Sequence, residues 1–386
     1  MSVSKAAITV AVKIDGQAKL PGDSGSKNNE QGQRVQRVHV DQRLDSPDFF
    51  SVQLQMSESH DITVLDKIKP GAAVEILIGY GDGGTIFKGE ISYIEPSFQG
   101  AERSVTISGY DLTHRMTRGT TSRTFGDGHK QTENPGSILG TVVSDSKALK
   151  GDKSDGLTAA TGTADSKLEY IAQYNMNDYQ FIQQVVGSFG MGWDSKSHNN
   201  GKQVSLKAPE TSGAAVLKIC RDKFKSDSEA QAISAAFRLS TVRQVAKVEV
   251  RGWDGVAKKA ILGKSEKISS PLGGTPGIEQ AGKAHYGSGS AGRLLSIVDV
   301  PVGSKGEADE IAQSIMDKLS MDWMTADVVI EGRPELHAGV VVELSEFGKR
   351  YSGKYIVEAC QHVFIAGSAA PYRSFLKLAR NASPEP

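Results

Sequence analysis

The chain has 386 residues, and its 45 lysines and arginines balance its 45 aspartates and glutamates, so the formal net charge is zero. This balance excludes the large basic field with which proteins hold a nucleic-acid backbone, and it provides no acidic tail. The length predicts about two to four domains. The 42 glycines and the low aromatic content of 6% favour short strands joined by tight turns, and therefore a mainly β protein.

No apolar run reaches the roughly 18 to 20 residues that cross a bilayer, so we expect synthesis in the bacterial cytoplasm and no membrane insertion. Residues 6–12 are apolar but lack a small-x-small cleavage site, and they predict a strand and not a secretion signal. The two cysteines, Cys220 and Cys360, lie far apart and outside any ligand-like cluster. We predict that both are buried as small hydrophobes, without a disulfide or a zinc site.

The N-terminal part has the pattern of an antiparallel β-barrel. A strand is predicted at 6–14, and the Gly-, Ser- and Asn-rich segment 16–34 predicts a mobile loop. Short β-branched segments separated by turn residues follow at 49–56, 74–78, 86–94 and 104–108. We therefore expect residues 1–115 to form a first β-barrel.

Residues 116–240 predict a small α+β domain. Apolar spacing indicates helices at 135–144 and 178–189, and Gly190 stands where a left-handed C-terminal residue is expected. A hairpin follows from 193 to 206, because its Asn200-Gly201 pair tolerates the positive φ angles of a type I′ turn.

The C-terminal part returns to strands. Residues 241–262 and 327–380 are predicted to form a second β-barrel, with 263–326 inserted as a loop and a helix and 381–386 as a tail or a linker to a spike. Within the insertion, 271–293 is rich in Gly, Ser and Pro and predicts a loop. Ser304 and Glu307 have the spacing of a capping box, and the apolar stripe behind them predicts a helix.

Short words of the two β regions resemble each other in sequence. The segment 71–76 (GAAVEI) is echoed by 339–344 (GVVVEL), and 87–91 (FKGEI) by 351–355 (YSGKY). A third echo links 105–111 (VTISGYD) to 248–254 (VEVRGWD). The candidate repeat positions are Gly71, Glu75, Gly89, Gly109, Asp111, Gly252, Asp254, Gly339, Glu343 and Gly353. If the repeat is real, three copies of the chain would place six similar barrels around one axis, a route from three-fold to six-fold symmetry.

Several motifs along the chain resemble the hub family of contractile tails, which includes phage late control D proteins and the N-terminal hub region of VgrG-type spike proteins. The motifs are 109–112 (GYDL) followed by Arg115 and 118–119 (RG), 177–182 (NDYQFI) with 190–192 (GMG), 332–336 (GRPEL), and 351–357 (YSGKYIV) with His362. The resemblance extends from about residue 35 to 380.

The resemblance implies a homotrimer with a central channel, docked on the hexameric inner-tube ring, with a spike beneath and baseplate components around it. VgrG-type chains continue into a further barrel and a β-helix, whereas this sequence stops at Pro386. The spike is then either a separate protein or a further part of a longer chain.

Catalytic templates do not fit the sequence. Residues 79–84 spell GxGxxG, but a strand-like segment follows instead of a helix, so a hairpin turn is predicted. Residues 287–292 spell it within a loop, and Lys258 stands where a phosphate-binding loop ending at 263–265 would need glycine. The eight histidines show no metal-binding spacing, and the strand setting of His362 suggests a structural hydrogen bond. We expect no active site, cofactor or metal.

Two functions of other classes remain as alternatives. A tail-associated cell-wall hydrolase would need a carboxylate pair in a sugar-binding cleft, with the pKa of one carboxyl raised. A carbohydrate-binding β module would not need to form a trimer. The predicted repeat of barrels favours the structural hub over both.

Overall fold

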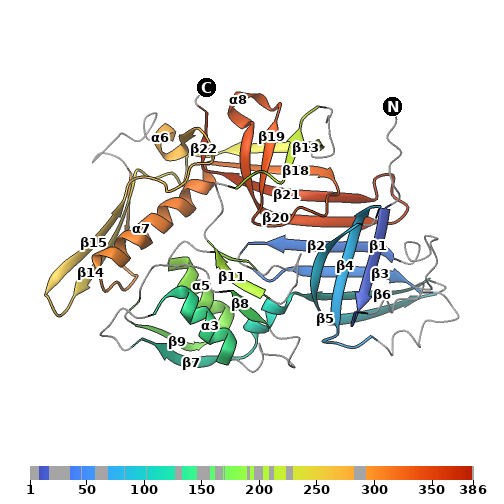
Figure 1. Ribbon diagram of the computed structural model, residues 1–386, viewed down its shortest axis with the longest axis horizontal. Helices are drawn as coiled ribbons and strands as arrows, with labels where there is room; N and C mark the ends of the chain where they lie inside the picture. Colours follow the sequence, from blue (N-terminus) through green and yellow to red (C-terminus); the bar gives the residue numbers. More distant parts are fainter. Residues whose placement is uncertain are drawn as a thin grey trace.

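A computed structural model gives the structure of the protein (Figure 1). It describes residues 8–16, 35–44, 46–56, 68–81, 83–100, 102–126, 133–145, 157–160, 168, 170–188, 192–194, 203–207, 213–222, 229–281 and 293–384. The predicted mobile loop 16–34 lies outside this set except for Gly16, as do Gly190, the Asn200-Gly201 turn and residues 287–292. The fold is mainly β, which confirms the predicted class.

Six strands form what we call the first β unit. They are β1 (Ile8–Ile14), β2 (Val35–Arg43), β3 (Phe49–Gln55), β4 (Ala73–Tyr80), β5 (Gly84–Gln99) and β6 (Glu102–Tyr110). The order across the sheet is β1-β4-β5-β6-β3-β2, with every pair antiparallel. Alternate residues of β2 to β4 point into one core that includes Val38, Phe50 and Ile76, as expected for strands with one buried face. Residues 1–115 were expected to form a closed first barrel. Among the described residues the ladders run continuously from β1 to β2 but none joins these two end strands.

The second β unit is a closed barrel. Its strands are β12 (Leu217–Cys220), β13 (Glu229–Leu239), β18 (Met324–Glu331), β19 (Val341–Ser345), β20 (Gly353–Ile365) and β21 (Tyr372–Arg380). The ring closes because β12 pairs in parallel with both β13 and β19, while β18-β13, β18-β21, β21-β20 and β20-β19 are antiparallel. Its core includes Trp323, Tyr355 and Leu376.

The two β units have the same strand order. If the strands of each unit are numbered along the chain, both sheets run first, fourth, fifth, sixth, third, second. One difference is direction, because β1 runs antiparallel to β4 whereas β12 runs parallel to β19. The two β units therefore repeat each other in strand order, and the short similar sequence segments mark only part of this repeat.

The domain boundaries predicted around the second barrel need correction. Strands β12 and β13 lie within 116–240, yet they belong to the barrel and not to the α+β insertion. Strand β14 (Lys247–Asp254) lies in a separate sheet with β15 (Lys259–Ser265) and β17 (Leu294–Ile297). Residues 241–262 were expected in the barrel because 248–254 repeats the letters of β6, but the position of β6 in the repeat is taken by β21. The similarity of 105–111 to 248–254 therefore does not reflect the repeat, because both segments only share a motif common where a strand ends in a turn.

The segment between the β units forms a compact α+β body. It contains η1 (Leu112–Thr117), β7 (Thr121–Phe125), α3 (Pro135–Asp145), β8 (Thr158–Ala160), β9 (Ile171–Met176), α5 (Asp178–Ser188), β10 (Gly192–Asp194) and β11 (Gln203–Lys207). The predicted helices are present, and the antiparallel β10–β11 pair confirms the predicted hairpin. Phe125 and Phe181 stack at 5.4 Å in the core of this body. Among the described residues, no helix has both the length and the apolarity to cross a membrane.

Helix α7 (Lys305–Ser320) packs on the β14–β15–β17 sheet. The Ser304 hydroxyl accepts a hydrogen bond from the Glu307 amide, as the predicted capping box requires, whereas the Glu307 carboxylate accepts from the Gly303 amide. Val248, Val250 and Ile311 are buried in this third core. Figure 1 shows α7 lying along β14 and β15, away from the first β unit.

The C-terminal tail is part of the fold through Ser383. Strand β22 (Ala382–Ser383) pairs with β16 (Thr275–Pro276), next to α6 (Gly277–Ala281), inside the segment predicted as a plain loop. Ser383 is buried, and its hydroxyl accepts a hydrogen bond from the Trp323 indole at 3.2 Å. The short elements η4 (Met321–Trp323) and α8 (Gly348–Tyr351) complete the chain. The prediction of residues 381–386 as a tail or a linker outside the barrel is therefore wrong for 381–383, which pack as part of the fold.

Candidate assembly interface

The two β units are joined edge to edge at a seam. Strand β2 pairs antiparallel with the far half of β20, from Arg37 opposite Ile365 to Arg43 opposite Ala359. The ladder makes one continuous sheet of the two units, and Figure 1 shows β2 lying directly beside β20. This backbone pairing fixes the position of the two β units relative to each other and the register of β2 against β20.

Side chains reinforce the seam above this ladder. The Tyr80 hydroxyl at the end of β4 donates a hydrogen bond to the Glu331 carboxylate at the end of β18. Gly84, at the start of β5, lies so close to Pro334 that a Cβ on it would come within 3.1 Å of the ring. Arg333 donates to the Glu229 carbonyl at 2.8 Å. The segment 332–336 thus contacts strands of both units.

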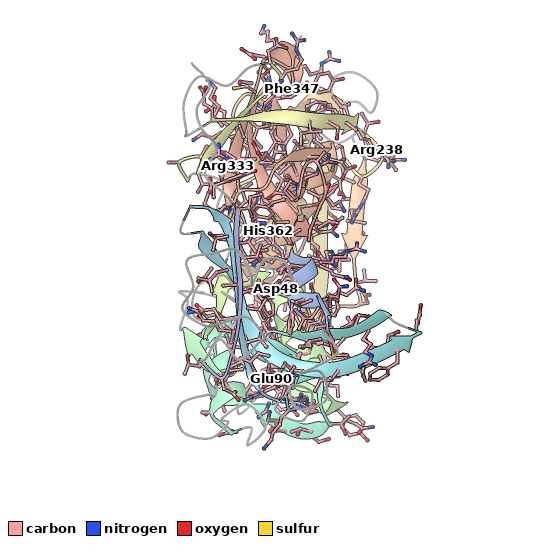
Figure 2. The ribbon with its side chains drawn as sticks, turned by 90° about the vertical axis from the view of Figure 1, so that its right-hand side faces the viewer. Asp48, Glu90, Arg238, Arg333, Phe347 and His362 are labelled. Atoms are coloured by element: carbon pink, nitrogen blue, oxygen red, sulfur yellow. The ribbon has the colours of Figure 1, made fainter. Side chains whose placement is uncertain are left out.

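His362 is a buried structural group in the seam. Its Nε2–H donates to the Leu336 carbonyl at 2.9 Å, and its Nδ1 accepts from the Tyr372 hydroxyl at 2.9 Å. Because burial disfavours the charged ring, the pKa of His362 is lowered to about 4. The ring therefore fixes the loop at 332–336 to β20 and β21, as its strand setting predicted. Figure 2 shows it between Arg333 and Asp48 along the length of the molecule.

This environment predicts a pH dependence of stability. The pKa of His362 is lower in the folded chain than in the unfolded one, so its neutral form contributes stability that is complete above about pH 6.5. The contribution should fall as the pH drops from 6.5 to 4. Urea unfolding at several pH values should give a slope against pH that is smaller in His362→Gln by up to about 1.4 kcal/mol per unit. An unchanged slope would contradict the assignment.

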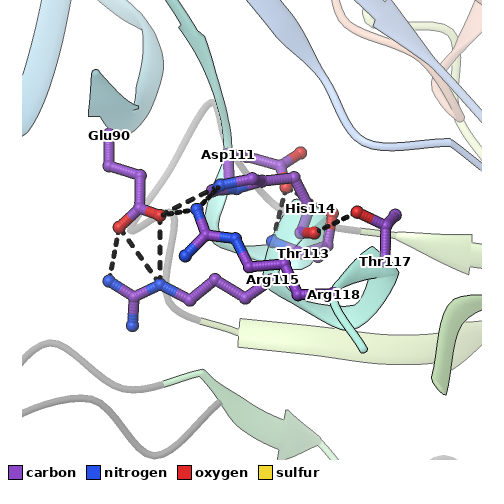
Figure 3. Close-up of polar contacts among 7 residues, drawn as sticks. All are labelled: Glu90, Asp111, Thr113, His114, Arg115, Thr117 and Arg118. Atoms are coloured by element: carbon purple, nitrogen blue, oxygen red, sulfur yellow. Dashed lines mark hydrogen bonds and ion pairs between the residues drawn. The ribbon is translucent and has the colours of Figure 1, made fainter. Parts of the chain in front are cut away.

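A buried carboxylate ties β5 to the helical turn η1 (Figure 3). The side chain of Glu90 is only 5% exposed, and Arg115 binds it through both Nε and Nη2. His114 Nε2 lies 3.1 Å from one carboxylate oxygen, and Arg118 lies 3.3 Å from the same atom. Although burial opposes ionisation, the hydrogen bonds of His114 and Arg115 lower the pKa of Glu90 to about 2. The carboxylate therefore stays charged.

Asp111 fixes the start of the same turn. Its side chain is fully buried, accepts a hydrogen bond from the Thr113 amide at 2.7 Å as an N-cap, and accepts from the Asp48 amide at 2.6 Å. The His114 ring donates from Nδ1 to the Asp111 carbonyl at 2.6 Å. The motif at 109–112 thus marks the end of the first β unit, where β6 ends and η1 begins.

The ten candidate repeat positions do not form one site. Gly71 and Gly339 occupy matching places: both have positive φ, and their amides donate to the carbonyls of Ile91 and Val357 at 2.7 and 2.8 Å. Glu75 and Glu343 lie on the strands that follow, β4 and β19, and Gly109 lies on β6 before Asp111. Gly252 and Asp254 belong to the separate sheet with β14.

The predicted equivalence of Gly89 and Gly353 is wrong by two residues. Gly89 is opposite Val74 in the first unit, and the residue opposite the matching Val342 is Tyr355. Gly353 is opposite Leu344 and has a φ of +131° beside the Arg380 guanidinium. The two sequences align at these glycines because both strands contain the motif aromatic-x-Gly. In the structure the two glycines lie at different ladder positions and contact different neighbours.

The described residues also bear on two other kinds of site, a metal site and a nucleotide-binding loop. They contain no group of three or more His, Cys, Asp or Glu side chains that could hold a metal ion. Strand β4 ends at Tyr80 and β5 begins at Gly84, with Gly81 at φ +68° between them, so a strand and not a helix follows this motif. Both cysteines are buried and free, as predicted. Sequence reasoning missed the Glu90 cluster, for which the only signal was a lone glutamate after Gly89 and two arginines near residue 115.

Comparison with solved structures identifies the fold. The 43 kDa tail protein of prophage MuSo2 from Shewanella oneidensis superposes with a TM-score of 0.65 at 12% identity, covering 97% of this chain and 99% of that one. A tail protein from Neisseria meningitidis MC58 gives a TM-score of 0.65 at 11% identity, covering 97% of both chains. The E. coli c3393 protein, a component of the type VI secretion system, gives 0.56 at 7% identity and covers 92% and 76%.

These likenesses define the class as a two-unit β fold shared with tail proteins. The chain belongs to the family described as the Alg8 N-terminal domain, whose model matches residues 8–365. No curated protein sequence matches the chain. The sequence-based resemblance to tail hubs thus agrees with the fold, while late control D and VgrG-type membership stay proposals.

Proposed function

We propose that the chain is a structural baseplate hub of a contractile injection system, with no enzymatic role. The observation that carries the proposal is the repeated strand order of the two β units, joined edge to edge by β2 and β20. Three copies would supply six similar units around a channel, which matches a hexameric tube above and a trimeric spike below. The partners are then a homotrimer, the inner tube ring, a spike and other baseplate components.

Two further observations support the proposal. The fold is shared with phage tail proteins, and the E. coli c3393 protein is itself structurally similar to the T4 bacteriophage tail proteins gp27 and gp5. Buried polar side chains are placed at joints of the fold: the charged Glu90 carboxylate and the neutral His362 ring hold strands, a turn and a loop together. On this proposal the chain is made in the cytoplasm and assembled into a tail particle.

Light scattering on the purified chain tests the proposal. At micromolar concentration we expect a mass three times the 41.2 kDa of the chain, because a continuous channel wall should bury more than the roughly 1,600 Å² of a standard interface. The trimer should also co-sediment with assembled tube protein, and it should leave the turbidity of a peptidoglycan suspension unchanged. A monomer, or clearing of the peptidoglycan, would contradict the hub.

A further inference from the structure

The seam inside one chain is a template for a contact between chains. On β20, β19 occupies one edge only from Gly353 to Ile356, and β2 takes the same edge from Ala359 to Ile365. The β2 edge of the first unit thus docks on the part of β20 that extends past β19. In a chain that repeats its topology, the second unit has its own counterpart of β2, and the first unit has its own counterpart of this extension.

The counterpart of the β20 extension is the arm of β5. Ile91 and Val357 both exchange backbone hydrogen bonds with the start of the preceding strand, and in both a bulge follows directly, at Ile91/Tyr93 and Val357/Ala359. Residues 93–99 therefore match 359–365. β4 reaches β5 no further than this point, and no described strand pairs with residues 93–99 on that side. Figure 2 shows the two-stranded arm extending beyond the body.

The counterpart of β2 is β13. A bulge interrupts both at the same place, at Val35/Arg37 against β3 and at Ala232/Ser234 against β18. Residues 234–239 therefore match 37–42. β12 pairs with β13 only from Glu229 to Gln231, so in the described chain the remaining edge has β18 on one side alone. Figure 2 shows Arg238 on this strand, on the side toward which the arm extends.

We propose that residues 234–239 of β13 pair antiparallel with residues 94–99 of β5 in a second copy of this chain, in the register of the β2–β20 seam. The proposal rests on the trimeric hub and names the contact that closes it. Val38 is opposite Phe364 in the seam, and the same register puts Ala235 opposite the Phe98 of the neighbour, a side chain 58% exposed in the single chain. It also puts Arg238 opposite Glu95, an attractive pair.

The proposed register places Pro96 opposite Phe237. Pro96 has no amide donor, so this pair keeps only the bond in which the Pro96 carbonyl accepts, and the ladder is weaker at this point. The contact is heterologous, because β13 of one copy meets β5 of the next. Such a contact closes into a ring when its rotation divides a full turn.

Cysteine cross-linking of the full chain tests the register. Ala236 and Ser97 match His39 and Val363. The Ala366 amide donates to the Gln36 carbonyl and the Leu44 amide to the Glu358 carbonyl, so the bonded pairs of this ladder fall at even positions of β2, and His39 and Val363 form a pair without mutual backbone bonds. Such pairs have Cα atoms about 4.5 Å apart, close enough for a disulfide. Under mild oxidation, the Ser97→Cys/Ala236→Cys variant should form covalent dimers and trimers on non-reducing gels. The matched control Ser97→Cys/Ser234→Cys, displaced by two residues, should form none.

Each outcome decides a different claim. A trimer by light scattering that cross-links only in the first variant supports the proposal. A trimer that does not cross-link, or that cross-links equally in both variants, overturns this contact and leaves the hub standing. A monomer overturns both. As a second measurement, Glu95→Arg should raise the concentration at which the trimer dissociates at least tenfold, and adding Arg238→Glu should restore it; no change with either would also overturn the contact.

Discussion

Glu90→Gln should lower the free energy of unfolding by about 3 to 5 kcal/mol, the usual cost of removing one partner of a buried ion pair. The amide would leave Arg115, whose side chain is 14% exposed, without a charged acceptor. Urea unfolding followed by circular dichroism measures the change. Glu279→Gln, at an exposed position on α6, is the matched control and should stay within about 0.5 kcal/mol.

The same variant has a characteristic pH dependence. Because the pKa of Glu90 is lower in the folded chain than in the unfolded chain, its contribution is complete above about pH 4.5 and is lost as the pH falls toward 2. The difference between the natural chain and Glu90→Gln should therefore shrink over this window. A difference that is constant with pH would mean that packing, and not the charge, holds η1 to β5.

Gly89→Val is the second substitution with a large expected effect. A Cβ on Gly89 would come within 2.3 Å of the Tyr110 carbonyl oxygen and 2.7 Å of the Phe87 ring. The carbonyl belongs to the β5–β6 ladder and cannot move without disrupting it. We expect a loss of about 3 kcal/mol in the free energy of unfolding.

A helical glycine provides the control for this substitution. Gly140 on α3 has no atom within 4 Å of an added Cβ, so Gly140→Ala should be neutral or stabilising by up to about 1 kcal/mol. An equally neutral Gly89→Val would contradict the prediction, because it would mean that the Tyr110 carbonyl and the Phe87 ring leave space for a side chain at position 89.

Local signals in the sequence predicted local structure well. Ser304 before the apolar stripe marked the start of α7, and the glycines at 79–84 marked a turn, because caps and turns depend on neighbouring residues. The general resemblance of the two β regions was also readable. Its register was not, since Gly89 and Gly353 share letters without sharing a ladder position.

The features that the sequence did not predict depend on contacts between residues far apart in the chain. Strand β13 reads as an alanine-rich segment without clear alternation, and only its ladder with β18 assigns it to the barrel. Glu90 and Arg115 are separated by a whole strand, so nothing in either local segment predicts their ion pair. Such contacts depend on which strands become neighbours, which is a property of the complete sheet.

On the proposed function, three copies of this chain build a ring of six similar β units. Electron microscopy of the purified oligomer, viewed down its axis, tests this arrangement most directly. We predict class averages with three-fold symmetry, six similar lobes and a central channel. Averages with two-fold symmetry, or single particles of 41.2 kDa without a ring, would contradict it.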